Sequence, residues 1–139
     1  MIRLAGQDDR EAVCAIDARL RDIPGRQTFI ERAIAAHECY LATLDDAVAG
    51  FAVLDRSFYG QPFVSLLIVD EQRRRRHIGT ALMRHIESVC PEEKLFTSTN
   101  ESNTPMQRLC DKLGYIQSGR IENLDDADPE IIYFKRLRR

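Results

Sequence analysis

An apolar run that leads directly into a basic turn and then an amphipathic helix is the feature that most constrains this chain. The run Phe63–Val69 is apolar almost throughout, which favours a central strand covered on both faces over an edge strand. The basic stretch 72–77 follows, and then apolar residues recur at i, i+3, i+4, i+8 and i+11 from Ile78. This spacing predicts a helix that ends before Pro91. The segment therefore predicts a strand, a turn and a helix in an α/β protein.

The basic turn lies where the predicted helix starts, and this position suits an anion. The first-turn amides of a helix lack partners within the helix and lie at the positive end of its dipole. Gly79 lets a phosphate approach the backbone, and guanidiniums supply charge-assisted hydrogen bonds. A run of arginines alone is more often a solvated loop or a nucleic-acid patch, but this one follows a central strand and lacks interleaved aromatic residues. The turn from Arg73 to Leu82 is therefore interpreted as a phosphate site.

The remaining apolar patterns predict strands and helices along the whole chain. Strands are expected at 2–5, 39–44, 47–54, 95–99, 115–121 and 131–134. Further helices are expected after Asp8 and Asp9, through the helical spacing of Ile30, Ala33, Ile34 and His37 to an end near Glu38, and from Pro105 to Leu113. A turn is expected at Asp45 and Asp46, and His37 is expected at the edge of the core. With 139 residues, 44% of them hydrophobic, and no linker, the chain is predicted to form one domain over residues 1–139.

Charge and cysteine content narrow the function classes. The 20 Lys and Arg nearly balance the 22 Asp and Glu, so the chain as a whole has no general attraction to nucleic acid or membranes. No apolar run is long enough to span a bilayer and the first residues do not resemble a signal peptide, so a cytoplasmic location is expected. Free thiols and no metal site are expected, because the cysteines stand far apart, without a CxxC pair or a histidine at ligand spacing: Cys14, Cys39, Cys90 and Cys110.

The basic turn resembles the signature of the GNAT family of N-acetyltransferases. That signature is Arg or Gln, two residues, Gly, one residue, then Gly or Ala, and the stretch Arg74 to Gly79 matches it except that His77 replaces the first glycine. A shifted register, Arg76 to Ala81, satisfies the same pattern. We prefer the first register, because Val69 then lies at the family's usual distance before the turn.

A second motif supports the resemblance. The stretch from Asn103 to Tyr115 is similar to the family's Asn-led helix, which ends in Lys-Leu-Gly and an aromatic residue. Both motifs occur in the expected order of strands and helices. The resemblance implies an α/β (α+β) fold with a single GNAT-like domain, in which helices flank a mixed, mostly antiparallel sheet of six or seven strands.

The resemblance also implies a co-substrate, acetyl-CoA, and no metal. In the family the cofactor lies beside the central strand, with its pyrophosphate on the basic turn. For Asn103, capping of the following helix is the alternative role. The residues implied to bind the cofactor are Leu67, Val69, Arg74, Arg75, Arg76, His77, Ile78, Gly79, Thr80 and Asn103.

The implied reaction is direct attack of a neutral amine on the thioester, without an acyl-enzyme. A primary amine of pKa ~10 is only ~0.1% neutral at pH 7, so a general base would help. Many relatives carry a tyrosine that can protonate the departing thiolate where this chain has Cys110, for which a core role is favoured. The weak catalytic candidates are Glu71, Cys110 and Tyr133, with Asp70, Glu122 and Glu130 as further carboxylates and Tyr115 as an alternative proton donor.

The acceptor stays open at the level of sequence. The acidic loop from Glu122 to Glu130 suits a cationic amine of a small molecule or peptide, but a solvated loop explains it equally well. Aminoglycosides, polyamines, amino acids and protein amines are all compatible with it. The alternative function is a non-catalytic CoA-sensing or nucleic-acid-binding module that uses the arginine-rich turn. No membrane partner is expected, nucleic acid is disfavoured, and a homodimer is compatible with the sequence.

Overall fold

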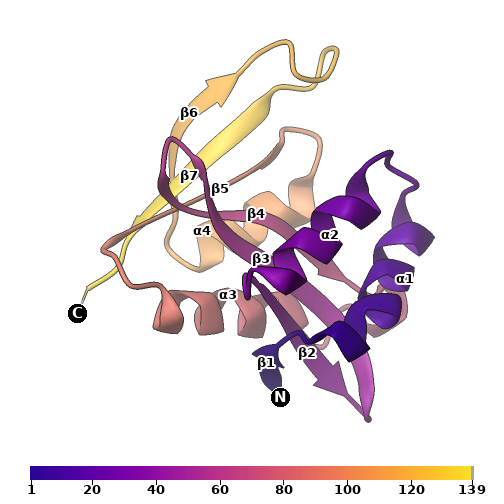
Figure 1. Ribbon diagram of the computed structural model, residues 1–139. Helices are drawn as coiled ribbons and strands as arrows, with labels where there is room; N and C mark the ends of the chain where they lie inside the picture. The colour runs from indigo at the N-terminus through magenta and orange to yellow at the C-terminus, as the bar shows by residue number, and fades with distance from the viewer. Residues whose placement is uncertain (139) are drawn as a thin grey trace.

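The structure, a computed structural model, describes residues 1–138 as seven strands and four helices (Figure 1). The helices are α1 (Arg10–Leu20), α2 (Arg26–Ala35), α3 (Ile78–Val89) and α4 (Thr104–Lys112). The strands are β1 (Ile2–Leu4), β2 (Cys39–Leu44), β3 (Ala47–Phe58), β4 (Gln61–Val69), β5 (Lys94–Asn100), β6 (Ile116–Ile121) and β7 (Glu130–Arg136). Short 3-10 turns at Gln7–Asp9 and Glu71–Arg73 precede α1 and α3. None of the helices within residues 1–138 combines the length and the apolar character that crossing a bilayer requires.

The strands form one sheet in the order β1-β2-β3-β4-β5-β7-β6. Neighbouring strands are antiparallel except β4 and β5, which run parallel and are joined through the crossover helix α3. The prediction of an α/β fold with a mixed, mostly antiparallel sheet of six or seven strands is therefore confirmed.

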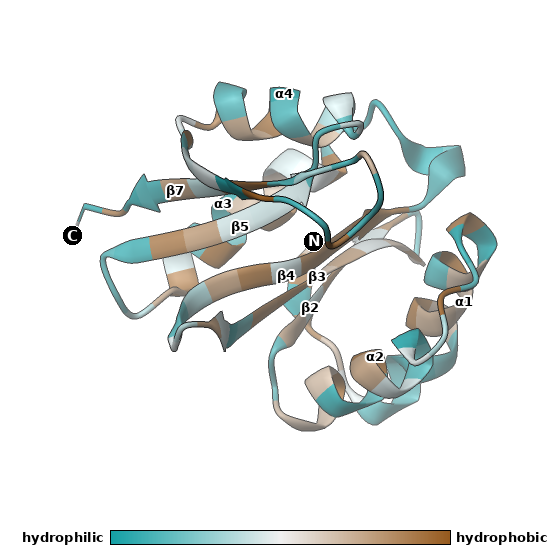
Figure 2. Cartoon of the chain, turned by 90° about the horizontal axis from the view of Figure 1, so that it is seen from above, coloured by the Kyte–Doolittle hydropathy of each residue, from teal (hydrophilic) through white to brown (hydrophobic). Residues whose placement is uncertain are grey.

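Helices cover the two faces of this sheet unequally. Helices α3 and α4 lie over one face and α1 and α2 over the other (Figure 2). Under α3 and α4, the core packs Leu82 and Ile86 against Leu95 and Tyr133 of the sheet. Helices α1 and α2 contact mainly β2, β3 and β4, so β5, β7 and β6 carry helices on one face only. The smaller core under α1 and α2 includes Val13, Ile16, Ile30, Ile34, Leu41 and Phe51.

The hairpin between β2 and β3 has the turn that the sequence predicts. Asp45 and Asp46 adopt φ of 53° and 61°, the left-handed backbone of a two-residue turn whose twist matches its strands. The strand after this turn runs beyond Leu54, where the sequence pattern ends it. It continues because its far end pairs with the start of β4, Phe58 with Gln61.

The helices follow the apolar periodicity closely, with one correction. The helix predicted from Ile78 is confirmed as α3. The helix expected to reach Glu38 ends at Ala35, and His37 takes a left-handed φ of 59°. This conformation ends a helix and turns the following side chains off its apolar face. The His37 side chain is therefore exposed, and its expected place at the edge of the core is wrong.

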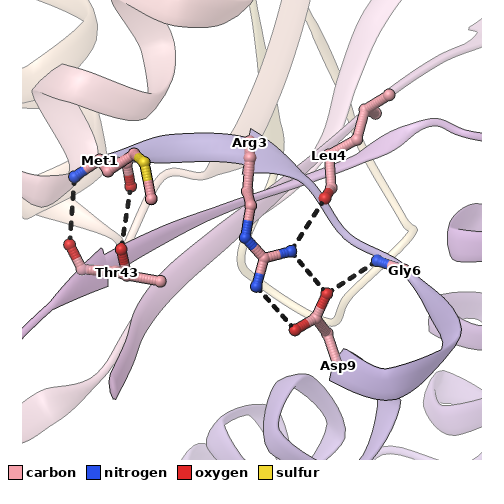
Figure 3. A network of polar contacts seen from close by, with 6 residues as sticks. All are labelled: Met1, Arg3, Leu4, Gly6, Asp9 and Thr43. Atoms are coloured by element: carbon pink, nitrogen blue, oxygen red, sulfur yellow. Dashed lines mark hydrogen bonds and ion pairs between the residues drawn. The ribbon is translucent and has the colours of Figure 1, made fainter. Parts of the chain in front are cut away.

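A charged hydrogen-bond network ties the N-terminal strand to the start of α1 (Figure 3). Arg3 donates from both terminal nitrogens to the Asp9 carboxylate, at 2.8 and 3.0 Å, and Gly6 N donates to it at 2.8 Å. Asp8 and Asp9 were expected to cap the helix. Asp9 does stand at the N-cap of α1, but its side chain closes the preceding 3-10 turn instead. The hydrogen bond from Arg3, together with that from Gly6, lowers the pKa of Asp9.

We expect Asp9→Asn to lower the free energy of unfolding by about 0.5 to 1 kcal/mol near pH 7, a small value because the Arg3 side chain is 45% exposed to water. Folding lowers the pKa of Asp9, so its contribution is complete above the ordinary aspartate pKa and is lost as the pH falls through the lowered value. Thermal denaturation should show the gap between wild type and variant closing below pH ~3.9. Asp8→Asn changes the adjacent exposed carboxylate; an equal effect there would contradict the assignment.

Candidate functional site

The parallel strands β4 and β5 pair over a short stretch and then separate in the middle of the sheet. Within residues 1–138, Phe63 with Phe96 and Val64 with Thr97 are their only pairs in register. Thr97 Oγ donates to Val64 O at 2.9 Å and secures the last pair. We call the point where the pairing stops the fork. Beyond it, the facing backbone edges of both strands lack each other as partners, which suits a ligand that carries amides.

A β-bulge in β4 causes the separation. Val53 and Leu54 are adjacent in β3, but their partners in β4, Leu66 and Val64, are not. Ser65 is therefore an extra residue in β4. Bulges bend a strand and increase its twist, so β4 turns away from β5 at this position.

The turn after β4 is anchored by a buried aspartate. Asp70 is 4% exposed, and its carboxylate accepts from Arg73 Nη1 at 2.6 Å and from Gln72 N at 3.3 Å. Its own N–H donates to Ala49 O at 2.8 Å, and Arg19 of α1 approaches the carboxylate to 3.6 Å. Two guanidiniums thus compensate Asp70, which is an anchor for the turn and poorly suited to act as a base.

Three arginines of the turn keep their charge unpaired. Arg74, Arg75 and Arg76 are exposed and form no ion pair within residues 1–138, whereas Arg73 is held by Asp70. Helix α3 begins directly after them, with no side chain capping its first turn. Free first-turn amides and free guanidiniums therefore stand next to each other along the chain, as the predicted anion site requires.

His77 has the backbone of a glycine. It occupies the N-cap of α3 with φ 60° and ψ 26°, the left-handed region that glycine adopts without strain. Position 77 thus behaves as the first glycine of the preferred register. The next residue, Ile78, is buried and offers a ligand only its main chain. At Gly79 a Cβ would lie 3.4 Å from Leu109 Cδ2 and 3.7 Å from Val69 Cγ2, so the packing there tolerates an alanine.

Other residues predicted to bind a cofactor lie on both sides of the fork. Leu67 and Val69 follow the bulge in β4, with side chains packed toward α3 and α4. Asn103 follows β5 and caps α4, because its Oδ1 accepts from Met106 N at 3.3 Å. The capping alternative for Asn103 is therefore observed. Its Nδ2 group takes no part in this cap.

The three weak catalytic candidates lie in different environments. Glu71 is exposed in the 3-10 turn after β4. Cys110 is fully buried, and burial raises the pKa of its thiol to about 12, which fits a residue of the hydrophobic core. Tyr133 is 1% exposed, pairs in register with Thr97 at the fork, and has a hydroxyl without a hydrogen-bond partner in the described chain. Burial raises the pKa of Tyr133; the nearby Gln117 counters part of this rise without the geometry of a hydrogen bond.

Tyr115, the alternative proton donor, is committed to a structural contact. Its hydroxyl donates to Glu87 of α3 at 2.7 Å, and Lys135 Nζ lies 3.0 Å from the same carboxylate. Burial and the hydrogen bond to Glu87 raise the pKa of Tyr115. A hydroxyl held in this way is poorly placed to serve the fork.

Sequence reasoning missed two polar pairs at the site, one on each strand of the fork. In β4, Ser65 Oγ donates to Asp55 Oδ2 at 2.7 Å. Ser98 Oγ donates to Glu130 Oε2 at 2.7 Å, and Ser98 is the first β5 residue past the fork. The sequence names Glu130 as a candidate carboxylate but does not predict its contact with Ser98. The available sequence signal was weak: Ser65 and Ser98 are polar residues within strands, and polarity alone does not report which distant strand they meet.

The acidic loop is fastened to the end of β5. Asn100 Nδ2 donates to Asp125 at 2.8 Å, and Ser102 donates from N and Oγ to Asp128 at 2.9 and 2.6 Å. These donors are neutral, so they bring no positive charge to the loop, whereas Glu122 in the same loop pairs with an arginine. The carboxylates do not converge on a metal site: among residues 1–138, no group of three or more His, Cys, Asp or Glu is placed to hold an ion.

The sequence and the fold resemble known proteins in the same way. The Acetyltransferase (GNAT) family model matches residues 10–115, and no curated protein matches the chain. A GNAT family acetyltransferase from Bacillus cereus is 35% identical, with a TM-score of 0.95 over 100% of this chain and 98% of its own. The ribosomal-protein-S18-alanine N-acetyltransferase of Escherichia coli shares the fold at 18% identity, with a TM-score of 0.87 over 100% and 94%. The structure of yncA from Salmonella typhimurium, solved with its cofactor acetyl-CoA, also shares the fold at 16% identity. Its TM-score is 0.79, over 100% of this chain and 94% of its own.

We expect His77→Gly to raise the free energy of unfolding by about 0.5 to 1 kcal/mol, because the substitution relieves a left-handed backbone and glycine is an acceptable N-cap. Thermal denaturation measures the change. His37→Gly is a matched control, with the same residue type at φ 59° in a turn outside the site. A gain at residue 37 with a loss at residue 77 would mean that the His77 imidazole itself stabilises the fold.

Proposed function

This chain belongs to the GNAT acetyltransferase family, and we propose that it transfers the acetyl group of acetyl-CoA to a primary amine of a peptide or small molecule. The observation that carries the proposal is the succession of the fork, the unpaired arginines and the uncapped start of α3 along one stretch of chain. Nothing in residues 1–138 favours the alternative of a CoA-sensing or nucleic-acid-binding module.

The residues of this segment fit a ligand with a pyrophosphate at one end and amides along its arm. Free guanidiniums and first-turn amides suit the pyrophosphate, and the unpaired edge of β4 beyond the bulge suits the amides. The free Nδ2 of Asn103 suits a further oxygen of the ligand. We propose that acetyl-CoA is held by Leu67, Val69, Arg74, Arg75, Arg76, His77, Ile78, Gly79, Thr80 and Asn103.

When bound, acetyl-CoA supplies the acetyl group as a thioester, which a neutral amine attacks directly. The thiols argue against an acyl-enzyme, because burial raises the pKa of Cys39 and Cys110 to about 12 and also raises that of Cys14. The acceptor ammonium must give one proton to a base, and a second N–H proton must reach the leaving thiol. We propose Glu130 for the first proton, since it is a partly exposed carboxylate linked to Ser98 beside the fork.

For the second proton we propose Tyr133. Its register partner Thr97 marks the fork, its hydroxyl is unpartnered in the described chain, and burial keeps that hydroxyl protonated at neutral pH. An unpaired buried hydroxyl destabilises a fold, and a role as proton donor in the loaded enzyme would account for its presence here. Glu71 and Cys110 stay weaker candidates, because Glu71 is solvated and Cys110 is a core residue.

The free thiols also bear on where the protein works. Cys14, Cys39, Cys90 and Cys110 form no disulfide in the described chain, which suits a reducing compartment. We therefore propose the cytoplasm as its location. Homodimer formation stays a further proposal, which sedimentation can decide.

Arg74→Ala and Arg76→Ala should each weaken acetyl-CoA binding by about tenfold or more, because each removes a charge-assisted hydrogen bond. Calorimetric titration with acetyl-CoA measures the affinity. Melting temperatures should change little, since Arg74 and Arg76 are exposed. Arg84→Ala removes an exposed arginine of α3 outside the turn and serves as control. Unchanged affinity in both site variants would remove the basis for the proposed cofactor site.

Tyr133→Phe should lower turnover by about tenfold to a hundredfold while leaving acetyl-CoA affinity unchanged and slightly raising the melting temperature, because the lost hydroxyl is buried and unpaired. Thiol release under saturating acetyl-CoA measures turnover. Cys110→Ala, a change in the same core, should keep most of the activity. A hundredfold loss in Cys110→Ala with cofactor binding intact, or full activity in Tyr133→Phe, would overturn these assignments.

A further inference from the structure

Four phenylalanines form a continuous row across the sheet, which we call the aromatic row. Phe58 of β3 stacks on Phe63 of β4 and contacts Phe96 of β5, with ring centroids 5.3 and 5.2 Å apart. Phe96 in turn lies 5.1 Å from Phe134 of β7. The exposed Tyr59 extends the row at the β3–β4 hairpin, 5.0 Å from Phe58.

The aromatic row belongs to neither hydrophobic core. The neighbours of these phenylalanines along each strand, Val64, Leu95 and Tyr133, point into the core under α3 and α4, so the row lies on the opposite face. That face is covered by α1 and α2 only over β2, β3 and β4 (Figure 2). All four rings are partly exposed, and they account for four of the six phenylalanines in the chain. Aromatic side chains kept out of the core in one contiguous patch mark a surface for another molecule.

The same face carries uncompensated negative charge beside the row. Glu130 lies four residues before Phe134 in β7, so both side chains project from this face. The Glu130 carboxylate accepts a hydrogen bond from Ser98, a neutral donor. No ion pair within residues 1–138 involves Glu130. At the other side of the row, Glu92 pairs with Arg56 and Glu93 with Arg136. Asp55, the register partner of Phe63, accepts from the neutral hydroxyls of Ser57 and Ser65 and forms no ion pair within residues 1–138.

The fork lies between the aromatic and the acidic parts of this face. Phe63 and Phe96 form the pair next to the last one, which is Val64 with Thr97. Ser98 is the first residue of β5 beyond that last pair. A molecule that placed apolar groups on the row and a cation on Glu130 would therefore hold its positive end beside the fork. It would reach the fork from the face that α3 and α4 leave open.

We propose that this face binds the acceptor as an extended peptide whose free α-amino group contacts Glu130 and whose next few side chains are apolar and lie on the aromatic row. The proposal rests on the acetyltransferase function proposed above and names its substrate class. Negative charge at the Glu130 end matches the α-ammonium, and the apolar rings match apolar side chains.

The dimensions of the face favour a peptide over a compact amine. The ring centroids of Phe58 and Phe134 lie 5.2 and 5.1 Å from that of Phe96, so the row from Phe58 to Phe134 is at most about 10 Å long. Glu130 is about 13 Å along β7 from Phe134. An extended chain covers such distances with about three to four residues each. A small amine with one ring would cover only a fraction of this surface.

The chemistry of the amine points the same way. An α-amino group has a pKa of ~8, against ~10.4 for a lysine side chain, so roughly a tenth of it is neutral at pH 7. Deprotonating an α-ammonium near pH 7 therefore costs less free energy than deprotonating a lysine ammonium, so a weaker base is sufficient. A single partly exposed carboxylate such as Glu130 is enough for that task.

The test compares four acceptors at saturating acetyl-CoA, by thiol release and by mass of the product. The first is the peptide Ala-Phe-Leu-Val-Gly-Ser, and the second is Ala-Ser-Gln-Thr-Gly-Ser, with the same first residue and polar followers. The third is the apolar peptide with a formyl-blocked α-amine and an added C-terminal lysine, and the fourth is phenylethylamine. We expect kcat/KM for the first peptide to exceed each of the others by about tenfold or more.

Two pairs of variants locate the site. Phe96→Leu keeps an apolar side chain but removes the ring, and it should lower kcat/KM for the apolar peptide severalfold. Phe29→Leu, the same change at an exposed phenylalanine of α2, should not. Glu130→Gln should lower it by about tenfold at pH 7, and the loss should shrink toward pH 9, where the α-amine is already neutral. Glu122→Gln, a change in the same loop at a carboxylate paired with Arg120, should have little effect.

Calorimetry with acetyl-CoA separates the two levels of inference. If acetyl-CoA binds and some amine is acetylated, but the polar peptide, the lysine or phenylethylamine is preferred, the peptide proposal is overturned and the acetyltransferase function stands. If acetyl-CoA does not bind, both are overturned. A dimer in sedimentation that Phe96→Leu dissociates would place a second copy on the aromatic row and would also overturn the peptide proposal.

Discussion

The end of strand pairing between β4 and β5 is the constraint on which the rest of this structure depends. Two neighbouring strands in the middle of a sheet normally satisfy each other's backbone groups, and here they do so only up to Val64 and Thr97. The bulge at Ser65 bends β4 away, and the bond from Thr97 Oγ to Val64 O holds the two strands at the last step. The sheet thus stays intact on both sides while it exposes two backbone edges to a ligand.

Charge is arranged around this fork, although the chain as a whole is nearly neutral. Free arginines and the start of α3 follow the end of β4, whereas the acidic loop is hydrogen-bonded to the end of β5. Asp70 forms an ion pair with Arg73, which anchors the turn. Within residues 1–138, the other three arginines of the turn have no such partner, so anchoring and free positive charge are supplied by different residues. A site with cationic and anionic sides is suited to an anionic cofactor and a cationic acceptor together.

Two departures from the family's usual residues have different structural consequences. His77 adopts the left-handed backbone of the glycine it replaces, so the geometry of the turn is kept at the expense of local strain. Cys110 fills the core under α3 and α4 and has no exposed thiol. The same core contains Tyr133 of β7, whose hydroxyl we propose as the proton donor. The first departure therefore keeps the backbone of the turn, and the second places a core residue where many relatives carry a tyrosine.

The sequence by itself determined most of the helices and strands and predicted the anion site, because both depend on local order. Apolar periodicity placed α3, and the position of the arginine run at its start predicted where free charge and free amides would meet. Only the tertiary structure decided that Ser98 meets Glu130, that the aromatic row joins four strands, and that Tyr133 stands at the fork. These contacts join segments far apart in the chain. The order of the strands and the position of the bulge decide which side chains meet, and neither produces a periodic pattern in the sequence.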